Sequence, residues 1–169
     1  MAALAVLANG AASATPQDPT DAVAALLDRA QIEDMLVDYY GHLGGGADRD
    51  LGSYYLEDGV LDVNGVVARG RKAIEDLYKD LAAHSPGLRG KFHMLLNNPQ
   101  ILVQGDTATA DLIWTGVLAE TPRAAPRILE QGREHDELVK RNGRWYLKYR
   151  VITSDGGLSA TFEKTYKDR

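Results

Sequence analysis

The stretch EHDELVKRNGRWYLKYRV, residues 134–151, contains two strand-like runs on either side of Asn142-Gly143. An Asn-Gly pair between such runs is the strongest short-range signal for a β-hairpin, because both residues tolerate the positive φ angles of a tight turn. We therefore expect two antiparallel strands here, over Ile128–Arg141 and Arg144–Ser154.

Two more strand-like segments precede this hairpin, Phe92–Val103 and Thr107–Glu120, with Gly105-Asp106 between them. A loop through Pro122 and Pro126 leads from them into the hairpin. Short turns between consecutive strands favour antiparallel neighbours, so these segments predict a four-stranded meander.

The part of the chain before the meander has a helical period. Apolar residues recur at helical spacing over Val23–Leu43, with a second short helix expected over Asp50–Leu56. Residues 60–70 hold an Asn-Gly hairpin signal, and Arg71–His84 is a further amphipathic helix. Helices followed by a meander are typical of an α+β fold, here a cone-shaped α+β barrel with a strongly curved antiparallel sheet wrapped around the helices.

The length of 169 residues and the hydrophobic content of 44% predict one domain, which we place at residues 21–169. Residues 1–20 form a disordered or signal-like segment, because Met1–Ala14 is apolar and ends in an A-x-A sequence. The prediction for location is therefore a bacterial cytoplasm or periplasm. The sequence lacks an apolar run of about 18 residues, so we expect no membrane-spanning helix.

The formal net charge of -5 and the absence of a basic stripe argue against a nucleic-acid partner. The sequence has no cysteine, which excludes disulfides, thiolate nucleophiles and Cys-ligated zinc. It also has no glycine-rich phosphate loop and no GxSxG motif, so nucleotide-binding and serine-hydrolase functions lack support.

The order of several motifs after residue 21 resembles the SnoaL-like branch of the nuclear transport factor 2-like superfamily. These motifs are RAQIEDMLVDYYGHL, LGSYYLEDGVLDVNG, GRKAIEDLY, the H-x-x-x-N of His93–Asn97, GDTATADLIW and EHDELVKRNGRWYLKYRV. The resemblance implies an α+β cone whose mouth receives an apolar small molecule. It leaves the reaction open, because this superfamily includes polyketide cyclases, ketosteroid isomerases, dehydratases, a dehydrochlorinase and non-catalytic proteins.

The resemblance implies a His-Asp dyad made of His93 and Asp48. A histidine can accept a proton near neutral pH, and a carboxylate on its other nitrogen stabilises the imidazolium. The connection HLGGGAD before Asp48 is longer and richer in glycine than in the relatives, so Asp50 is the second choice. The alternative is structural, with a surface aspartate and a core histidine.

Arg150 matches a pocket arginine of the dehydrochlorinase-like members, where it would neutralise developing negative charge. Strict strand alternation leaves open whether it is buried, because Tyr146, Lys148 and Ile152 share its face. Tyr39 is expected to stabilise a substrate oxygen, because dehydratases of the superfamily use tyrosines in this region.

Four residues are expected to line the substrate site: Tyr40, Tyr55, Asn97 and Trp114. Core packing is the alternative for the tyrosines and Trp114. Asn97 shares the strand face of His93, four residues away. His135 and Asp136 suggest a metal with His93, but adjacent strand residues face opposite sides, so we expect no metal and no organic cofactor.

These features predict a cofactor-independent lyase, of dehydratase type, that removes a proton from a hydrophobic aromatic or polycyclic molecule. The alternatives are a C–C lyase releasing formaldehyde from a lignin-derived diaryl compound, a ketosteroid-isomerase-like or polyketide-cyclase-like enzyme, and a non-catalytic binding module. We also expect a homo-oligomer, dimer or trimer, because pairs such as Leu95 and Leu96 place apolar residues on both sheet faces.

Overall fold

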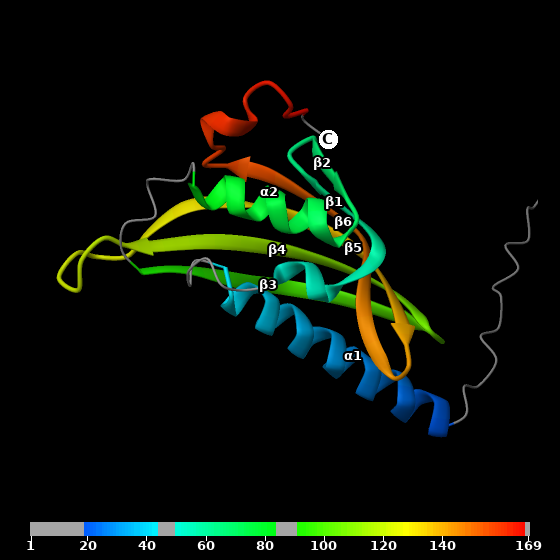
Figure 1. Ribbon diagram of the computed structural model, residues 1–169. Helices are drawn as coiled ribbons and strands as arrows, with labels where there is room; N and C mark the ends of the chain where they lie inside the picture. The colour runs from blue at the N-terminus through cyan, green and yellow to red at the C-terminus, as the bar shows by residue number, and fades with distance from the viewer. Residues whose placement is uncertain (1–18, 44–49, 84–90, 168–169) are drawn as a thin grey trace, which may run out of the picture.

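The computed structural model describes residues 19–43, 50–83 and 91–167. Two α-helices and six strands make up most of it (Figure 1). In chain order, the elements are α1 (Pro19–Gly41), the 3-10 helix η1 (Leu51–Tyr54), β1 (Tyr55–Val63), β2 (Val66–Arg69), α2 (Arg71–Ala83), β3 (Lys91–Gln104), β4 (Thr107–Ala119), β5 (Arg127–Arg141), β6 (Arg144–Gly156) and η2 (Ala160–Phe162). None of the described helices is both long and apolar enough to cross a membrane.

The six strands form one curved sheet in the order β2-β1-β6-β5-β4-β3, which confirms the predicted α+β class. Two details differ from the expectation. The sheet is mixed, because β1 runs parallel to β6 while every other pair is antiparallel. It is also open, since β2 and β3 lie at opposite edges, and so the cone is not a closed barrel.

The predicted meander is confirmed as β3 to β6, with bounds within about two residues of those expected. The β1–β2 hairpin turns at Asn64 and Gly65, which both have positive φ angles, and Asn142 and Gly143 do the same between β5 and β6. The positive φ angles are the feature that the Asn-Gly signal anticipates.

The segment expected to be a second helix, Asp50–Leu56, forms only one short 3-10 turn and then continues as a strand. Only residues 51–54 form a 3-10 turn, capped by Asp50, whose side chain accepts a hydrogen bond from the backbone N–H of Ser53. Tyr55 is already extended and begins β1. One 3-10 turn is enough to bury the apolar residues that it contains. The chain then becomes extended because β1 pairs with β6 from Tyr55 onward.

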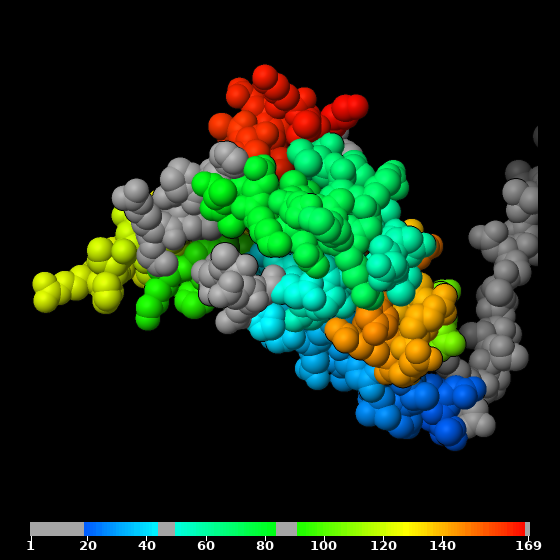
Figure 2. Space-filling model, viewed as in Figure 1, coloured from blue at the N-terminus to red at the C-terminus, as the bar shows by residue number. Residues whose placement is uncertain are grey.

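Helix α1 begins at Pro19, four residues before Val23, the first residue of the apolar stripe, and buries only its C-terminal half. Ile32, Leu36 and Tyr39 are buried, whereas Val23 and Leu26 of the predicted stripe are exposed. The first turns of α1 extend past the sheet (Figure 1). Its N-terminal half is held instead by Asp28, which accepts hydrogen bonds from Lys140 and Trp145 of the β5–β6 hairpin, and Figure 2 shows this hairpin seated against the helix.

We call the face of the sheet that packs against both helices the inner face, and the opposite one the outer face. A β-bulge decides which residues of β6 point inward. Glu137 pairs with Tyr149 but Leu138 pairs with Leu147, so Lys148 is an extra residue in β6. The bulge shifts the alternation, and Arg150 joins Trp145 and Leu147 on the inner face.

A glycine in β5 makes room for a tryptophan side chain on the inner face. A Cβ on Gly132 would lie 2.2 Å from the carbonyl oxygen of Thr153 and 2.4 Å from Cζ2 of Trp114. The indole of Trp114, which is buried, therefore occupies the space that a side chain at residue 132 would need. Such a close approach is a recognised reason for a glycine inside a strand.

We predict that Gly132→Ala lowers the free energy of unfolding by about 1–3 kcal/mol, because the added methyl group forces Trp114 or β6 to move. Urea denaturation followed by circular dichroism measures this. Gly156→Ala is the matched control, since a Cβ there meets nothing within 4 Å. Equal stability of the two variants would contradict the packing described.

Apolar side chains also lie on the outer face. Leu96 and Leu112 belong to the inner face, while Leu95 and Ile113 are 49% and 38% exposed on the other side. Apolar exposure of this kind favours association. We propose that the outer face packs against a second copy of the chain, as a homodimer or homotrimer.

Light scattering should then give a mass of two or three times 18.4 kDa at micromolar concentration. Leu95→Glu is expected to shift the mass towards the monomer, because it places a charge in the contact. Val37→Glu, at an exposed position of α1 away from the outer face of the sheet, serves as control. A monomeric parent protein would refute the proposal.

Candidate active site

The inner face holds a fully buried arginine at its centre. Arg150 of β6 is 0% exposed, and its Nε and Nη2 donate to the two carboxylate oxygens of Asp136 over 2.7 and 2.9 Å. The two residues are cross-strand partners on β6 and β5. A bidentate pair of this geometry fixes the guanidinium plane and balances its charge.

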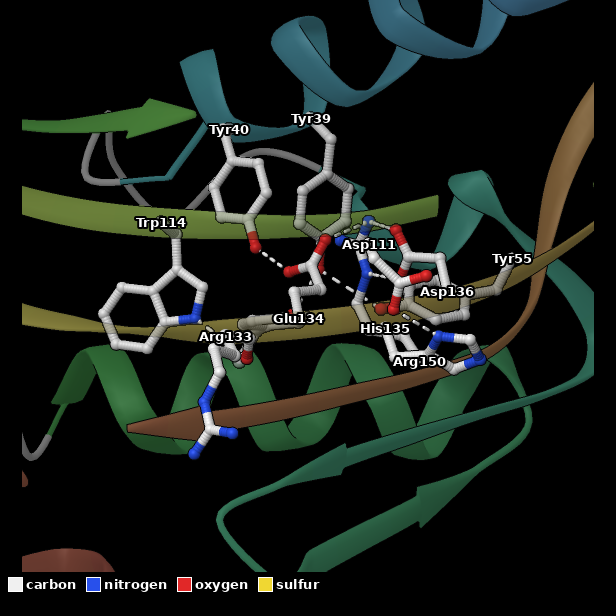
Figure 3. A network of polar contacts seen from close by, with 11 residues as sticks. Tyr39, Tyr40, Tyr55, Asp111, Trp114, Arg133, Glu134, His135, Asp136 and Arg150 are labelled. Carbon is white, nitrogen blue, oxygen red and sulfur yellow. Dashed lines mark hydrogen bonds and ion pairs between the residues drawn. The ribbon is translucent and has the colours of Figure 1, made fainter. Parts of the chain in front are cut away.

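A second carboxyl group contacts the same guanidinium. Oε1 of Glu134 lies 3.1 Å from Nη2 of Arg150, and Oε2 accepts a hydrogen bond from the hydroxyl group of Tyr40 on α1. Figure 3 shows these residues between α1 and the sheet. Within the described residues, Oε1 of Glu134 and Nη1 of Arg150 lack a hydrogen-bond partner, although both atoms are buried.

Tyrosines cover the guanidinium from the helix side. The Tyr39 ring lies over it, with its centroid 4.3 Å from Cζ of Arg150, which is within the range of a cation–π contact. The Tyr39 hydroxyl lies 3.3 Å from that of Tyr55 on β1 and also hydrogen bonds to Tyr78 on α2. Three elements that are distant in sequence thus contribute phenol groups to one cluster.

Burial dominates the acid–base behaviour of this cluster. It raises the pKa of Tyr39, partly offset by Arg150, and it raises the pKa values of Tyr40 and Tyr55 well above their usual range. The phenols therefore stay protonated and can donate hydrogen bonds. Burial also raises the pKa of Glu134 well above its usual range, against the opposing charge of Arg150.

Arg150 keeps its charge in this environment. Burial alone would lower its pKa, but Asp136 and Glu134 raise it well above the usual value. The cluster therefore combines a permanent cation with several neutral donors, shielded from water. Such an arrangement can stabilise a negative charge that develops on a ligand oxygen.

Five of the predicted site residues are brought together on the inner side: Tyr39, Tyr40, Tyr55, Trp114 and Arg150. Trp114 is buried beside them, and its indole N–H donates to the backbone carbonyl of Arg133 over 3.3 Å. Core packing and site formation thus coincide for these residues.

His93 and Asn97 are not brought to this cluster. On β3, Met94 and Leu96 pack against the core, so His93 and Leu95 point to the outer face and are exposed. Asn97 has the same direction, and its side chain donates to Thr115 over 3.1 Å. The expectation that His93 points into the cone is corrected here, because the apolar neighbours at the even positions occupy the inner face.

Asp48, the expected partner of His93, lies outside the described residues. Asp50, the second choice, is exposed and caps η1. The proposed dyad therefore gains no support from Asp50, while the Asp48 pairing stays a prediction.

His135 and Asp136 point to opposite faces, as strand alternation predicts. His135 lies on the outer face, where its Nδ1 is 2.7 Å from the carboxylate of Asp111, whereas Asp136 faces inward to Arg150. Among the described side chains, there is no group of three or more His, Asp or Glu residues that could hold a metal ion.

Sequence reasoning assigned no role in this site to Glu134 and Tyr78. Every residue of Glu134–Glu137 is charged or polar, so polarity alone does not reveal which two point inward. Tyr78 lay on the apolar stripe of its helix and was indistinguishable from a packing residue. A signal was available for Glu134, because alternation with the buried Leu138 puts it on the core side.

The architecture assigns the protein to a fold class, and the sequence then assigns it to a family. The two helices against an open six-stranded sheet form the cystatin-like α+β fold that is also typical of nuclear transport factor 2-like proteins. The model of the SnoaL-like domain matches residues 24–151, and the chain therefore belongs to the SnoaL-like domain family. No curated protein matches the sequence.

Several solved structures are similar to this chain. Rv3472 of Mycobacterium tuberculosis, of unknown function, is 25% identical, with a TM-score of 0.67 over 83% of this chain and 78% of that chain. An NTF2-like protein from Novosphingobium aromaticivorans is 23% identical, with a TM-score of 0.68 over 91% of this chain and 100% of that one. A proposed scytalone dehydratase from the same organism is 24% identical, with a TM-score of 0.62 over 81% and 89% of the two chains.

We predict that Asp136→Asn destabilises the protein by about 3–5 kcal/mol, because it leaves the guanidinium of Arg150 buried with its main counter-charge removed. Chemical denaturation measures the change. Glu137→Gln is the control, since this neighbour lies on the exposed side and forms an ion pair with Lys148 at 3.0 Å. A loss no larger than that of the control would show that the buried ion pair is energetically dispensable.

Proposed function

We propose that the protein is a lyase that removes a proton from a hydrophobic aromatic or polycyclic small molecule and expels a leaving group, with dehydration as the favoured reaction. The observation that carries this proposal is the buried Arg150, covered by protonated tyrosines. Removal of a proton next to a carbonyl group puts negative charge on its oxygen, and this cluster supplies both a cation and donors for it.

The described residues support roles for three groups. Arg150 supplies fixed positive charge, oriented by Asp136. Tyr39 and Tyr55 supply hydroxyl donors linked to each other at 3.3 Å. No step of the proposal uses a metal or an organic cofactor, because side chains alone can stabilise an enolate oxygen.

The same stabilisation would serve C–C cleavage with loss of formaldehyde, isomerisation or cyclisation, since each passes through a similar oxyanion. Dehydration is favoured because the family match is accompanied by structural likeness to a proposed scytalone dehydratase. A non-catalytic binding module is the alternative from another class. Such a module would need an apolar pocket but not the buried charge of Arg150.

A screen of aromatic dimers, hydroxysteroids and polyketides for an absorbance change, without added cofactor, tests the proposal. For a substrate found in this way, we expect Arg150→Lys to lower kcat/KM by about 10²–10³-fold, because Lys cannot keep the bidentate geometry. Tyr39→Phe should lower it less, since Tyr55 and Tyr78 remain.

Circular dichroism must show that both variants remain folded. Lys148→Gln, an outer-face cation, is the control for general charge effects. Full activity of a folded Arg150→Lys variant would reject the oxyanion role of this cluster. Binding of the screened compounds without any turnover would favour the non-catalytic alternative.

A further inference from the structure

The proposed reaction needs a proton acceptor on the inner face, and His93 points away from it. The inner row of β5 offers another candidate. Four alternate residues of β5 make up this row, and each pairs with a residue of β4: Glu130 with Gly116, Gly132 with Trp114, Glu134 with Leu112 and Asp136 with Ala110. Trp114, Leu112 and Ala110 are buried in the core. Glu130 therefore lies on the same face as Arg150, Asp136, Glu134 and the tyrosines that cover them, which we call the Arg150 cluster.

Glu130 occupies an apolar niche formed by three strands. A Cβ on Gly116 would lie 2.8 Å from Cγ of Glu130 and 2.9 Å from Cε2 of Phe92, so the two side chains meet above this glycine. The chain after β6 closes another side, because a Cβ on Gly157 would lie 2.6 Å from Cα of Glu130. Gly116 and Gly157 leave the space that the Glu130 side chain fills.

This carboxyl group has no partner in the part of the chain that the structure describes. Asp136 pairs with Arg150 and Glu134 bonds to Tyr40, but no hydrogen bond or ion pair joins Glu130 to another described residue. Burial raises its pKa, and no charge on a described residue contributes to the shift. An isolated carboxyl group in a half-buried apolar niche costs stability, and such groups are concentrated at functional sites.

Trp114 lies between Glu130 and the Arg150 cluster. Its indole covers Gly132, the residue between the two glutamates in the inner row. Residues 130 and 134 are about 13 Å apart along an extended strand. A ring compound stacked near the indole could therefore direct its carbonyl oxygen to the cluster and an adjacent carbon towards Glu130.

We propose that Glu130 is the proton-transferring carboxylate of this site, a catalytic residue that acts on the carbon next to the carbonyl group of the ligand. The inference rests on the proposed lyase function and names its base. The carboxylate takes the proton, the C–H electron pair forms the enolate, and the Arg150 cluster stabilises the enolate oxygen. In a dehydration, the enolate electrons then expel the hydroxyl group, which takes the proton back from Glu130 and leaves as water.

The test measures the first step alone, as exchange of the α-protons of indanone, tetralone and a hydrophobic ketosteroid into heavy water, followed by NMR. We expect Glu130→Gln to slow exchange by about 10²–10⁴-fold. Glu130→Asp should restore part of the rate. His93→Ala and the outer-face control Glu137→Gln should leave the rate unchanged. The parent rate should rise with pH as Glu130 ionises, and Glu130→Gln should lose this rise.

A second measurement does not depend on turnover. Carbon NMR of glutamate-labelled protein should show one carboxyl resonance that titrates above the usual value of about 4.3 and disappears in Glu130→Gln. An ordinary titration of Glu130, or a Glu130→Gln variant within twofold of the parent rate, would overturn the inference. Loss of exchange in His93→Ala alone would return the base to His93.

The outcomes separate this inference from the proposed function. If the parent protein exchanges protons and Glu130→Gln does so equally well, the lyase proposal stands and only the base is wrong. If the parent exchanges none of the ketones while Arg150→Lys binds them as tightly as the parent, the proposed function fails and the role of Glu130 fails with it.

Discussion

The burial of one guanidinium group is the constraint on which the inner face depends. Removing Arg150 from water costs several kcal/mol unless an opposite charge is held in matching geometry. Asp136 meets this need from the neighbouring strand, and its two oxygens fix the plane of the guanidinium. The register of β5 against β6 must therefore be kept, because a shift of one residue would turn either charge to the outer face.

The bulge at Lys148 explains how both strands satisfy this requirement. Trp145 and Leu147 must face inward to complete the core, and strict alternation would then send Arg150 outward. One extra residue in β6 resolves the conflict. Bulges are common next to functional sites because they redirect a side chain without ending the strand.

Sequence reasoning found the elements more reliably than the directions of their side chains. The Asn-Gly pairs located both hairpins, since few other dipeptides tolerate the positive φ angles that both turn residues must adopt. The parallel pairing of β1 with β6 was not predictable, because residues 55–63 carry no signal for the partner strand. The direction of His93 was also hidden, since Phe92–Leu96 has apolar residues at both odd and even positions.

The site residues show the same division. Arg150, Tyr39, Tyr40 and Tyr55 were found through the family resemblance, while alternation alone left the burial of Arg150 open. Glu134 and Glu130 required the three-dimensional register, because what distinguishes them from other glutamates is the group that faces each of them across β4 and α1. The sequence shows which residues are acidic, but not which groups their carboxyl groups contact.

The three carboxyl groups on the inner row of β5 differ in how well their charge is balanced by a partner. Among the described residues, Asp136 has a full counter-charge, Glu134 shares a guanidinium and accepts from a phenol, and Glu130 has neither. Stability alone would favour replacing the uncompensated group by an apolar residue. Glu130, beside Phe92 and without a partner among the described residues, and the fixed cation of Arg150 on the same face are the two groups that the proposed proton transfer requires: an acceptor that is easily protonated and a charge that never titrates. The acid with the least compensation among the described residues of this face is therefore the group that we propose as the proton carrier.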